Sequence, residues 1–305
     1  MRILITGANG MLGEKCSLKM SEKHEVFASD VQEDLQFKCP IPYTKIDLTE
    51  PKQIKAVIEK FEPEAIINCA AYTDVDGSED NQELARAINV QGVQNLIDAA
   101  KPYNAHIVHI STDYVFDGSS GPYEEDDEIN PINFYGKTKF ESEKVLVESG
   151  LPVTIIRTNV LFGNSQSKAA NFVNWVVENL RNGETIKVVN DQFGNPTWVN
   201  GLAEVAQKVI EQELEGIFHY GGEDYLSRFE FALEIADVFS LDNKLIEKVT
   251  TRALNQKAER PYKAGLISDK LKNSLDIKLY SIKDALKHMK AEIEETEEQE
   301  DAESQ

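Results

Sequence analysis

The chain has 305 residues, of which 41% are hydrophobic and 28% charged, enough apolar side chains for one large domain or two unequal ones. Its 53 acidic and 32 basic residues give a net charge of −21, which argues against a nucleic-acid polymer or an anionic membrane surface as partner. Three scattered cysteines, Cys16, Cys39 and Cys69, lack metal-binding spacing, so we expect no metal site and a reducing compartment. Because no run is suited to a signal sequence or a membrane span, the sequence predicts a cytoplasmic protein.

Short, β-branched apolar runs alternate with amphipathic helical stretches over the first half of the chain. The apolar runs are residues 2–7, 24–30, 44–48, 65–71, 106–112 and 153–158. Helical periodicity lies between most of them, for example at residues 51–61 and 81–101. This alternation predicts an α/β fold of the Rossmann type, in which helices cover both faces of a doubly wound parallel sheet.

After Gly163 the regular alternation weakens. Helices are expected near residues 169–181 and 200–213, and strands at 185–190 and 216–222. We therefore predict a first domain at 1–163, to which some later segments return, and a smaller C-terminal α/β lobe at 164–290. Residues 291–305 carry eight acids and no base, a composition that predicts a disordered acidic tail.

The first predicted strand leads directly into the glycine-rich segment "TGANGMLG", residues 6–13. Gly7 permits a tight turn, Gly10 lets a pyrophosphate approach the backbone, and Gly13 lets the following helix pack closely on the strand. The N-terminus of that helix offers free N–H groups to the phosphates. The second strand ends in Asp30, whose carboxylate can bond the adenosine ribose and would repel a 2′-phosphate. The pattern predicts an NAD(H) or NADP(H) site, with NAD slightly favoured.

A second motif, "NFYGKTK" at residues 133–139, places Tyr135 and Lys139 four residues apart on one face of a predicted helix. An ammonium beside a phenol lowers the pKa of the phenol towards the range useful for proton transfer. Thr112 ends the strand at 106–112, at the sheet edge where ligands bind in open α/β folds. We therefore predict that Thr112, Tyr135 and Lys139 form a catalytic group beside a nicotinamide.

Further motifs accompany these: "STDYVFDG" at 111–118, "IIRTNVLFG" at 155–163, "DQFGNPT" at 191–197 and "RPYKAGL" at 260–266. With them, the chain resembles the extended short-chain dehydrogenases/reductases, and within these the dTDP-4-dehydrorhamnose reductase family, from residue 1 to about 266. The resemblance implies NAD(P)H-dependent reduction of a 4-keto group on a nucleotide-linked deoxysugar, in the biosynthesis of cell-surface polysaccharides. It also implies that Tyr135 donates a proton, Lys139 holds the nicotinamide ribose, and Thr112 orients the carbonyl oxygen.

The resemblance also implies binding residues by position. Cofactor contacts are expected along the glycine-rich loop and the strand ends, at Gly7, Asn9, Gly10, Met11, Leu12, Gly13, Asp30, Asp47, Leu48, Cys69, Ala70, Ala71, Tyr72, Tyr135 and Lys139. Substrate contacts are expected at Asp113, Tyr114, Asn159, Gln192 and Arg260. Arg260 is assigned to the nucleotide diphosphate because phosphate recognition commonly uses arginine.

On the substrate side the chain departs from the family. "RTNVLFG", with Asn159, lacks the tryptophan that forms a wall of the sugar site, and Gly77 stands where the family has a basic residue. Reduction is therefore better supported than any particular sugar. Two other readings stay open: a nucleotide-sugar epimerase or dehydratase, and a non-catalytic dinucleotide-binding subunit resembling the regulatory subunit of methionine adenosyltransferase. A homodimer is also left open.

One pair of histidines is not expected to bind a metal. His106 and His109 lie three apart on a predicted strand, so their side chains point to opposite faces. We expect both to be packing or strand-end residues.

Overall fold

The computed structural model describes residues 1–167 and 171–303 of the chain. Its centre is a seven-stranded sheet in the order β11-β6-β5-β4-β1-β2-β3, in which every pairing is parallel. The strands are β1 (Arg2–Thr6), β2 (Glu25–Asp30), β3 (Tyr43–Lys45), β4 (Ala65–Asn68), β5 (His106–Thr112), β6 (Val153–Thr158) and β11 (Gly216–His219). This order confirms the predicted doubly wound α/β fold.

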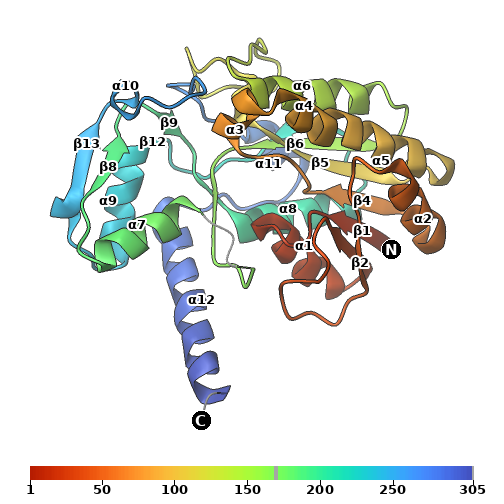
Figure 1. Ribbon diagram of the computed structural model, residues 1–305, viewed down its shortest axis with the longest axis horizontal. Coiled ribbons are helices and arrows are strands. Elements are labelled where there is room, and N and C mark those ends of the chain that lie inside the picture. Colours follow the sequence, from red (N-terminus) through yellow and green to blue (C-terminus); the bar gives the residue numbers. More distant parts are fainter. Residues whose placement is uncertain (168–170, 304–305) are drawn as a thin grey trace.

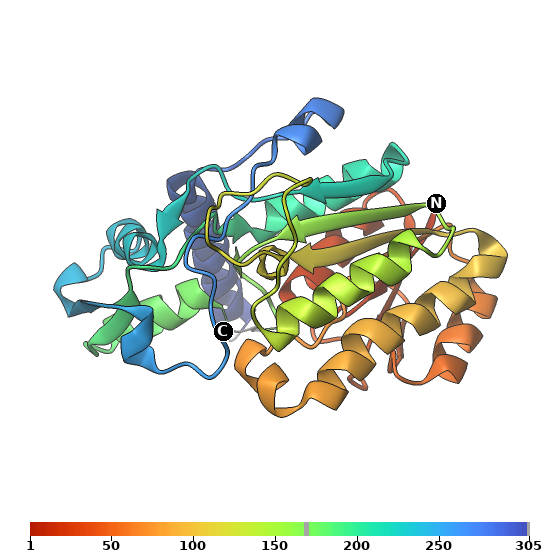
Figure 2. The same cartoon turned by 90° about the horizontal axis from the view of Figure 1, so that it is seen from above.

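Helices cover both faces of the sheet (Figures 1 and 2). On one face lie α1 (Met11–Ser21) and α8 (Val199–Glu211), and on the other α2 (Pro51–Phe61), α5 (Gly92–Ala100) and α6 (Phe134–Val147). Successive residues of β1 serve the two faces: Ile3 and Ile5 pack in the cluster with α1, whereas Leu4 packs with α2 and α5. Burial on both faces explains why the strands read as continuous apolar runs.

The predicted helix at 81–101 is interrupted in the structure. After α3 (Val75–Asp80), α4 (Gln82–Arg86) leads through a π-helical segment, Ala87–Gln91, into α5, and a 3₁₀ turn, Lys101–Tyr103, ends it. The π-helical segment carries the buried Asn89, whose amide bonds the backbone of Tyr72 and the hydroxyl of Thr138. Such insertions often occur near functional sites.

The residues after β6 build a smaller lobe with a core of its own. Its elements are β7 (Leu161–Phe162), α7 (Phe172–Arg181), β8 (Ile186–Val189), β9 (Phe193–Gly194), β10 (Thr197–Trp198), β12 (Leu226–Ser227), α9 (Arg228–Val238), β13 (Ile246–Val249) and α10 (Thr251–Leu254). Within this stretch, α8, β11 and α11 (Asp269–Ser274) return to the main sheet, where β11 pairs with β6. After the boundary predicted at residue 163, the chain therefore passes between the smaller lobe and the main sheet more than once.

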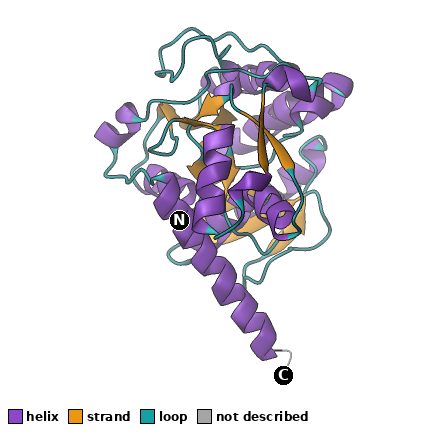
Figure 3. Cartoon of the chain, turned by 90° about the vertical axis from the view of Figure 1, so that its left-hand side faces the viewer, coloured by secondary structure: helices purple, strands orange, loops and turns teal. Residues whose placement is uncertain are grey.

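The acidic C-terminus differs from its prediction. Instead of a disordered tail from residue 291, the structure continues helix α12 (Ile282–Glu303) as far as residue 303, and residues 304–305 of the predicted tail lie outside the described residues (Figures 1 and 3). Glu292 accepts hydrogen bonds from Lys15 and Asn200, and Ile293 packs against the core of the smaller lobe. These tertiary contacts, added to the good helix propensity of glutamate, outweigh the acidic composition. In the described part of the chain, neither α12 nor any other helix is long and apolar enough to span a membrane.

Candidate active site

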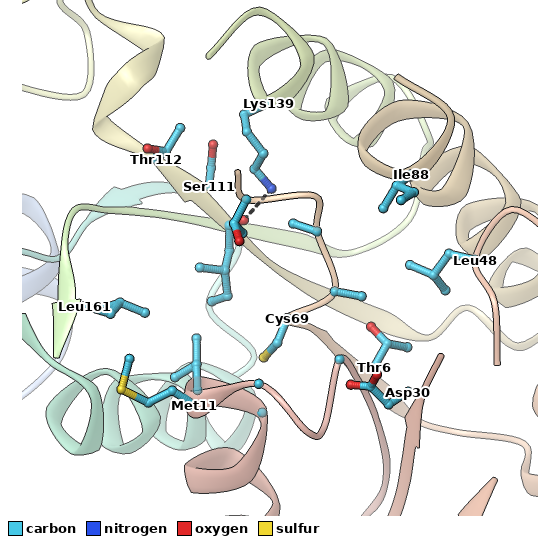
Figure 4. A pocket seen from close by; sticks show the side chains of 18 of the residues that line it. Thr6, Met11, Asp30, Leu48, Cys69, Ile88, Ser111, Thr112, Lys139 and Leu161 are labelled. Carbon is cyan, nitrogen blue, oxygen red and sulfur yellow. Dashed lines mark hydrogen bonds between the residues drawn. The ribbon is translucent and has the colours of Figure 1, made fainter. Parts of the chain in front are cut away.

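A cavity of about 930 Å³ lies along the carboxyl ends of the central strands (Figure 4). Its volume is typical of a site for a small molecule or cofactor. Most of the residues expected at the site line it, namely Gly7, Asn9, Gly10, Met11, Leu12, Gly13, Asp30, Asp47, Leu48, Cys69, Ala70, Ala71, Thr112, Asp113, Tyr114, Tyr135, Lys139 and Asn159. The sheet therefore brings together segments that are more than 100 residues apart in the chain.

The glycine-rich loop has the geometry that its sequence predicts. Gly7 has φ +69°, and a Cβ there would lie 2.6 Å from the backbone nitrogen of Ala70. A Cβ on Gly13 would lie 2.1 Å from the carbonyl oxygen of Gly7, so helix α1 could not pack as closely on the loop. Gly10 precedes α1, and in the described structure no side chain caps that helix. The N–H groups of its first turn thus remain for an anionic ligand in the cavity.

Asp30 is fixed by the backbone at the end of β2. Its Oδ2 accepts a hydrogen bond from the N–H of Asn9 at 3.0 Å, and its Oδ1 accepts one from Val31 at 2.8 Å. The carboxylate therefore stands beside the glycine-rich loop, one strand away from it, where the fold places the adenosine ribose of a dinucleotide. The cradle and this carboxylate fit a nicotinamide dinucleotide.

Thr112 and Tyr135 meet at the other end of the cavity. Both residues line the cavity, and the threonine hydroxyl acts on the phenol in the direction that lowers its pKa. Burial raises the pKa of Tyr135 above its ordinary value, and the threonine hydroxyl only partly offsets this effect. The expectation that Lys139 lowers the pKa of this phenol is therefore wrong for the structure as it stands, because the lysine makes its contacts elsewhere.

Lys139 is buried, and its ammonium points into the cavity from α6 (Figure 4). Nζ donates a hydrogen bond to the carbonyl of Ile110 at 2.7 Å and lies 2.9 Å from Nε2 of His109. Burial lowers the pKa of Lys139 to about 8, although Glu143 and Cys69 oppose the shift. A large part of the lysine population would thus lose its charge in mildly alkaline solution.

Behind the lysine lies a chain of buried polar groups. Nδ1 of His109 is 3.0 Å from the amide nitrogen of Asn68, and the hydroxyl of Thr6 donates to Oδ1 of Asn68 at 2.7 Å. Burial and the nearby Lys139 charge hold the pKa of His109 well below its ordinary value, so this imidazole is neutral. Sequence reasoning set His109 aside as a packing residue, whereas the structure connects it to the predicted catalytic lysine.

A second, smaller cavity adjoins the first on the side of the smaller lobe. Residues common to both are Asp113, Tyr114, Asn159, Val160 and Arg228, and Gln192 lines the second alone. Burial raises the pKa of Asp113 to about 7, which the Thr112 hydroxyl and the Arg228 charge partly oppose. Four predicted substrate residues, Asp113, Tyr114, Asn159 and Gln192, thus lie on one continuous surface.

Two expected site residues lie outside both linings. Tyr72 is held through its backbone by Asn89, and Arg260 donates to the Asp76 carboxylate at 2.9 Å and to the carbonyl of Ala258. The diphosphate role expected for Arg260 is therefore not supported, because Asp76 already neutralises its guanidinium.

The arginine that faces the cavities is Arg228, which sequence reasoning missed. One feature could have indicated a functional role for Arg228: it is the first residue of a helix, where the helix dipole disfavours a cation. Among the described residues, no group of three or more His, Cys, Asp or Glu side chains is arranged to hold a metal.

The parallel sheet, the glycine-rich cradle and the group formed by Thr112, Tyr135 and Lys139 define an extended short-chain dehydrogenase/reductase. More specifically, a family profile described as "RmlD substrate binding domain" matches residues 1–295, and the chain belongs to this family.

Named relatives agree with this assignment. The chain is 36% identical to a dTDP-4-dehydrorhamnose reductase of Aggregatibacter actinomycetemcomitans, over 96% of this chain and 99% of that protein. It is 31% identical to the crystal structure of a dTDP-4-dehydrorhamnose reductase of Bacillus anthracis in complex with NADP, with a TM-score of 0.87 over 95% of this chain and 99% of the other. It is also 30% identical to methionine adenosyltransferase 2 subunit beta of Xenopus laevis, over 88% of this chain and 81% of that protein.

Proposed function

We propose that this protein is an NAD(P)H-dependent reductase of the dTDP-4-dehydrorhamnose reductase type, which reduces the 4-keto group of a nucleotide-linked deoxysugar. The observation that carries the proposal is the meeting of Thr112 and Tyr135 in the cavity that the glycine-rich loop also lines. The bacterial relatives named as such reductases support the choice of reaction.

In this proposal each of the three side chains has one task. Bound NAD(P)H supplies the hydride. Thr112 donates a hydrogen bond to the substrate carbonyl and orients it, and Tyr135 donates the proton that the developing alkoxide takes up. The raised pKa of Tyr135 keeps the phenol protonated at neutral pH, as a proton donor requires. Lys139 would hold the nicotinamide ribose with its ammonium.

The choice of dinucleotide follows from Asp30. Its backbone-held carboxylate favours NADH over NADPH, because it would accept hydrogen bonds from a free ribose 2′-hydroxyl and repel a 2′-phosphate. The Bacillus anthracis relative was solved with NADP, so the family does not impose NAD. We propose that both cofactors bind and that NADH is used somewhat better.

The proposal is tested by following the oxidation of NADH and NADPH with dTDP-4-keto-L-rhamnose generated in place. We expect turnover that falls by a factor of about 10² to 10⁴ in Tyr135→Phe, since that variant keeps the ring and loses the transferred proton. Tyr103→Phe, on the 3₁₀ turn after α5 and remote from the cavity lining, is the matched control. Turnover equal in wild type and Tyr135→Phe would contradict the proposal.

One other function has a specific observation in its favour. The similarity to methionine adenosyltransferase 2 subunit beta matches the non-catalytic reading, in which the dinucleotide site serves a binding subunit. Dinucleotide binding without turnover of any keto-sugar, together with recovery of a stoichiometric enzyme partner, would favour that reading. The cytoplasmic location, a homodimer and the domain boundaries at 163 and 290 stay predictions.

A further inference from the structure

Where the two cavities meet, Asn159 presents a hydrogen-bond donor that has no acceptor. The residue is 7% exposed, and its Oδ1 accepts a hydrogen bond from the hydroxyl of Thr197 at 3.0 Å. In the described structure its Nδ2 is buried without a partner. An unpaired buried N–H group costs about 1–3 kcal/mol, so such groups in native proteins call for a partner. Asn159 therefore keeps an unused donor in a side chain that lines both cavities.

The residue packed beside this amide is Gly194. A Cβ added to Gly194, in the segment "DQFGNPT", would lie 3.2 Å from Nδ2 of Asn159. This is tighter than ordinary carbon contacts, so a side chain at that position would crowd the amide. Gly194 and Asn159 both line the second cavity.

Arg228 supplies a positive charge at the same junction, since it lines both cavities as Asn159 does. Its backbone N–H donates to the carbonyl of Gln192 at 3.0 Å, and its guanidinium carbon lies 5.3 Å from the centre of the Phe172 ring. Among residues 1–167 and 171–303, the guanidinium forms no ion pair and no hydrogen bond. Burial lowers the pKa of Arg228, yet a guanidinium keeps its charge in proteins.

The nearby carboxylate of Asp113 balances this charge only in part. The pKa of Asp113, raised to about 7 by burial, leaves much of it protonated in neutral solution. Arg260, the other cation whose charge acts on Arg228, is itself paired with Asp76. The junction thus combines a charged fork of donors with an amide donor, which is the arrangement that recognises carboxylate and phosphate oxygens.

We propose that Asn159 and Arg228 together bind an anionic oxygen group of the substrate. The inference rests on the proposed function, since the ligand is a nucleotide-linked sugar, and it specifies what the sugar nucleotide presents at the junction. Two sources supply that chemistry: the diphosphate, or a carboxylate on the sugar.

The test measures binding to the protein saturated with NADPH, by calorimetry. The probes are dTDP-glucose and dTDP-glucuronate, which differ only at C6 of the sugar: the first has a hydroxymethyl group there and the second a carboxylate. The variants are Arg228→Met, Arg228→Lys and Asn159→Leu, with Arg181→Met at the exposed end of α7 as the matched control. Retention of NADPH binding shows that each variant is folded. If Arg228→Met is not folded, the test uses Arg228→Lys and Asn159→Leu instead.

We expect Arg228→Met and Asn159→Leu each to raise the Kd of an anionic probe by about tenfold or more, consistent with loss of a charged hydrogen bond. An equal loss for both probes assigns the site to the diphosphate, and a loss confined to dTDP-glucuronate assigns it to a sugar carboxylate. Changes below about twofold for both probes in both variants would overturn the inference.

The binding test of the anion site can succeed or fail independently of the turnover test of the proposed function. The binding measurement requires no turnover, so a protein that reduces no keto-sugar can still show the loss in Arg228→Met, and the anion site then stands while the reductase fails. Conversely, keto-sugar turnover that is unchanged in both variants, together with unchanged probe binding, leaves the reductase standing and removes the anion site.

Discussion

The ammonium of Lys139 and Nε2 of His109 lie 2.9 Å apart in the buried layer between α6 and β5. The imidazole is in turn connected through Asn68 to Thr6, at the end of β1. Through this chain the end of the strand that carries the glycine-rich loop contacts the residue expected to hold the nicotinamide ribose. This geometry predicts that His109 positions Lys139.

Replacing His109 tests this relationship. In His109→Leu, we expect kcat/KM for the cofactor to fall by about tenfold, because Lys139 loses a partner that stabilises its position by about 1.4 kcal/mol. Lys139, with a pKa of about 8 from burial, should lose activity as the pH rises through that value. Losing the polar imidazole disfavours the charged lysine further, so the alkaline limb should move to lower pH.

The measurement is kcat/KM between pH 6 and 9.5. His106→Leu is the matched control, because His106 is a buried histidine of the same strand that contacts Thr154 instead. A profile for His109→Leu that matches that of His106→Leu would show that the contact with Lys139 has no functional effect.

Asp113 should make the stability of the protein depend on pH. Burial raises its pKa from 3.8 to about 7, so the folded protein binds this proton more tightly than the unfolded chain. The stabilisation is fully present below the unfolded pKa and is lost as the pH rises through about 7. Asp113→Asn, which cannot ionise, should therefore gain stability relative to wild type by about 3 kcal/mol between pH 5 and pH 8.

Urea unfolding of wild type and Asp113→Asn at the two pH values measures this difference. Asp117→Asn provides the contrast, since hydrogen bonds from Ser119 and Tyr123 lower the pKa of Asp117 to about 2. Its stabilisation is lost only as the pH falls through its folded pKa, so its effect should be the same at pH 5 and pH 8. An Asp113→Asn difference that does not vary with pH would mean that the carboxyl is ionised throughout.

Much of the fold was readable from the sequence, because strands buried on both faces leave continuous apolar runs and the glycine positions follow from close backbone contacts. The roles of His109 and Arg228 were not. Strand alternation gives the face on which His109 lies but not the lysine that contacts it there, and the direction of Arg228 depends on how α9 packs within the smaller lobe. Arg260 was assigned by residue type, and only the structure shows that Asp76 pairs with it.

Asp30 should control the choice between the two dinucleotides. Asp30→Asn keeps an oxygen that can accept from the N–H of Asn9 and removes the charge. Repulsion between two charges about 4 Å apart near a protein surface is on the order of 1–4 kcal/mol. We expect the ratio of kcat/KM for NADPH to that for NADH to rise by about tenfold, corresponding to about 1.4 kcal/mol.

Steady-state kinetics with each cofactor tests the prediction. Asp34→Asn, an exposed carboxylate on the same loop that lies outside the cavity lining, controls for the general loss of negative charge. If both variants change the ratio equally, the field of the acidic chain and not Asp30 itself would set the preference.

The C-terminal helix should contribute to stability only over its first part beyond residue 290. Glu292 pairs with Lys15 at 3.3 Å and accepts from Asn200 at 2.7 Å, and Ile293 contacts the core of the smaller lobe. Removing residues 291–305 should therefore lower the free energy of unfolding by about 1–3 kcal/mol, the usual cost of losing a partly buried charged hydrogen bond. Removing residues 298–305, which take no part in these contacts, should change it by less than about 0.5 kcal/mol. Glu292→Ala and the exposed Glu295→Ala form the matched pair, and denaturant unfolding of all four proteins gives the comparison. Equal stability of the two truncated proteins would mean that the contacts of Glu292 and Ile293 add nothing, and the acidic segment would then behave as the tail that its composition predicts.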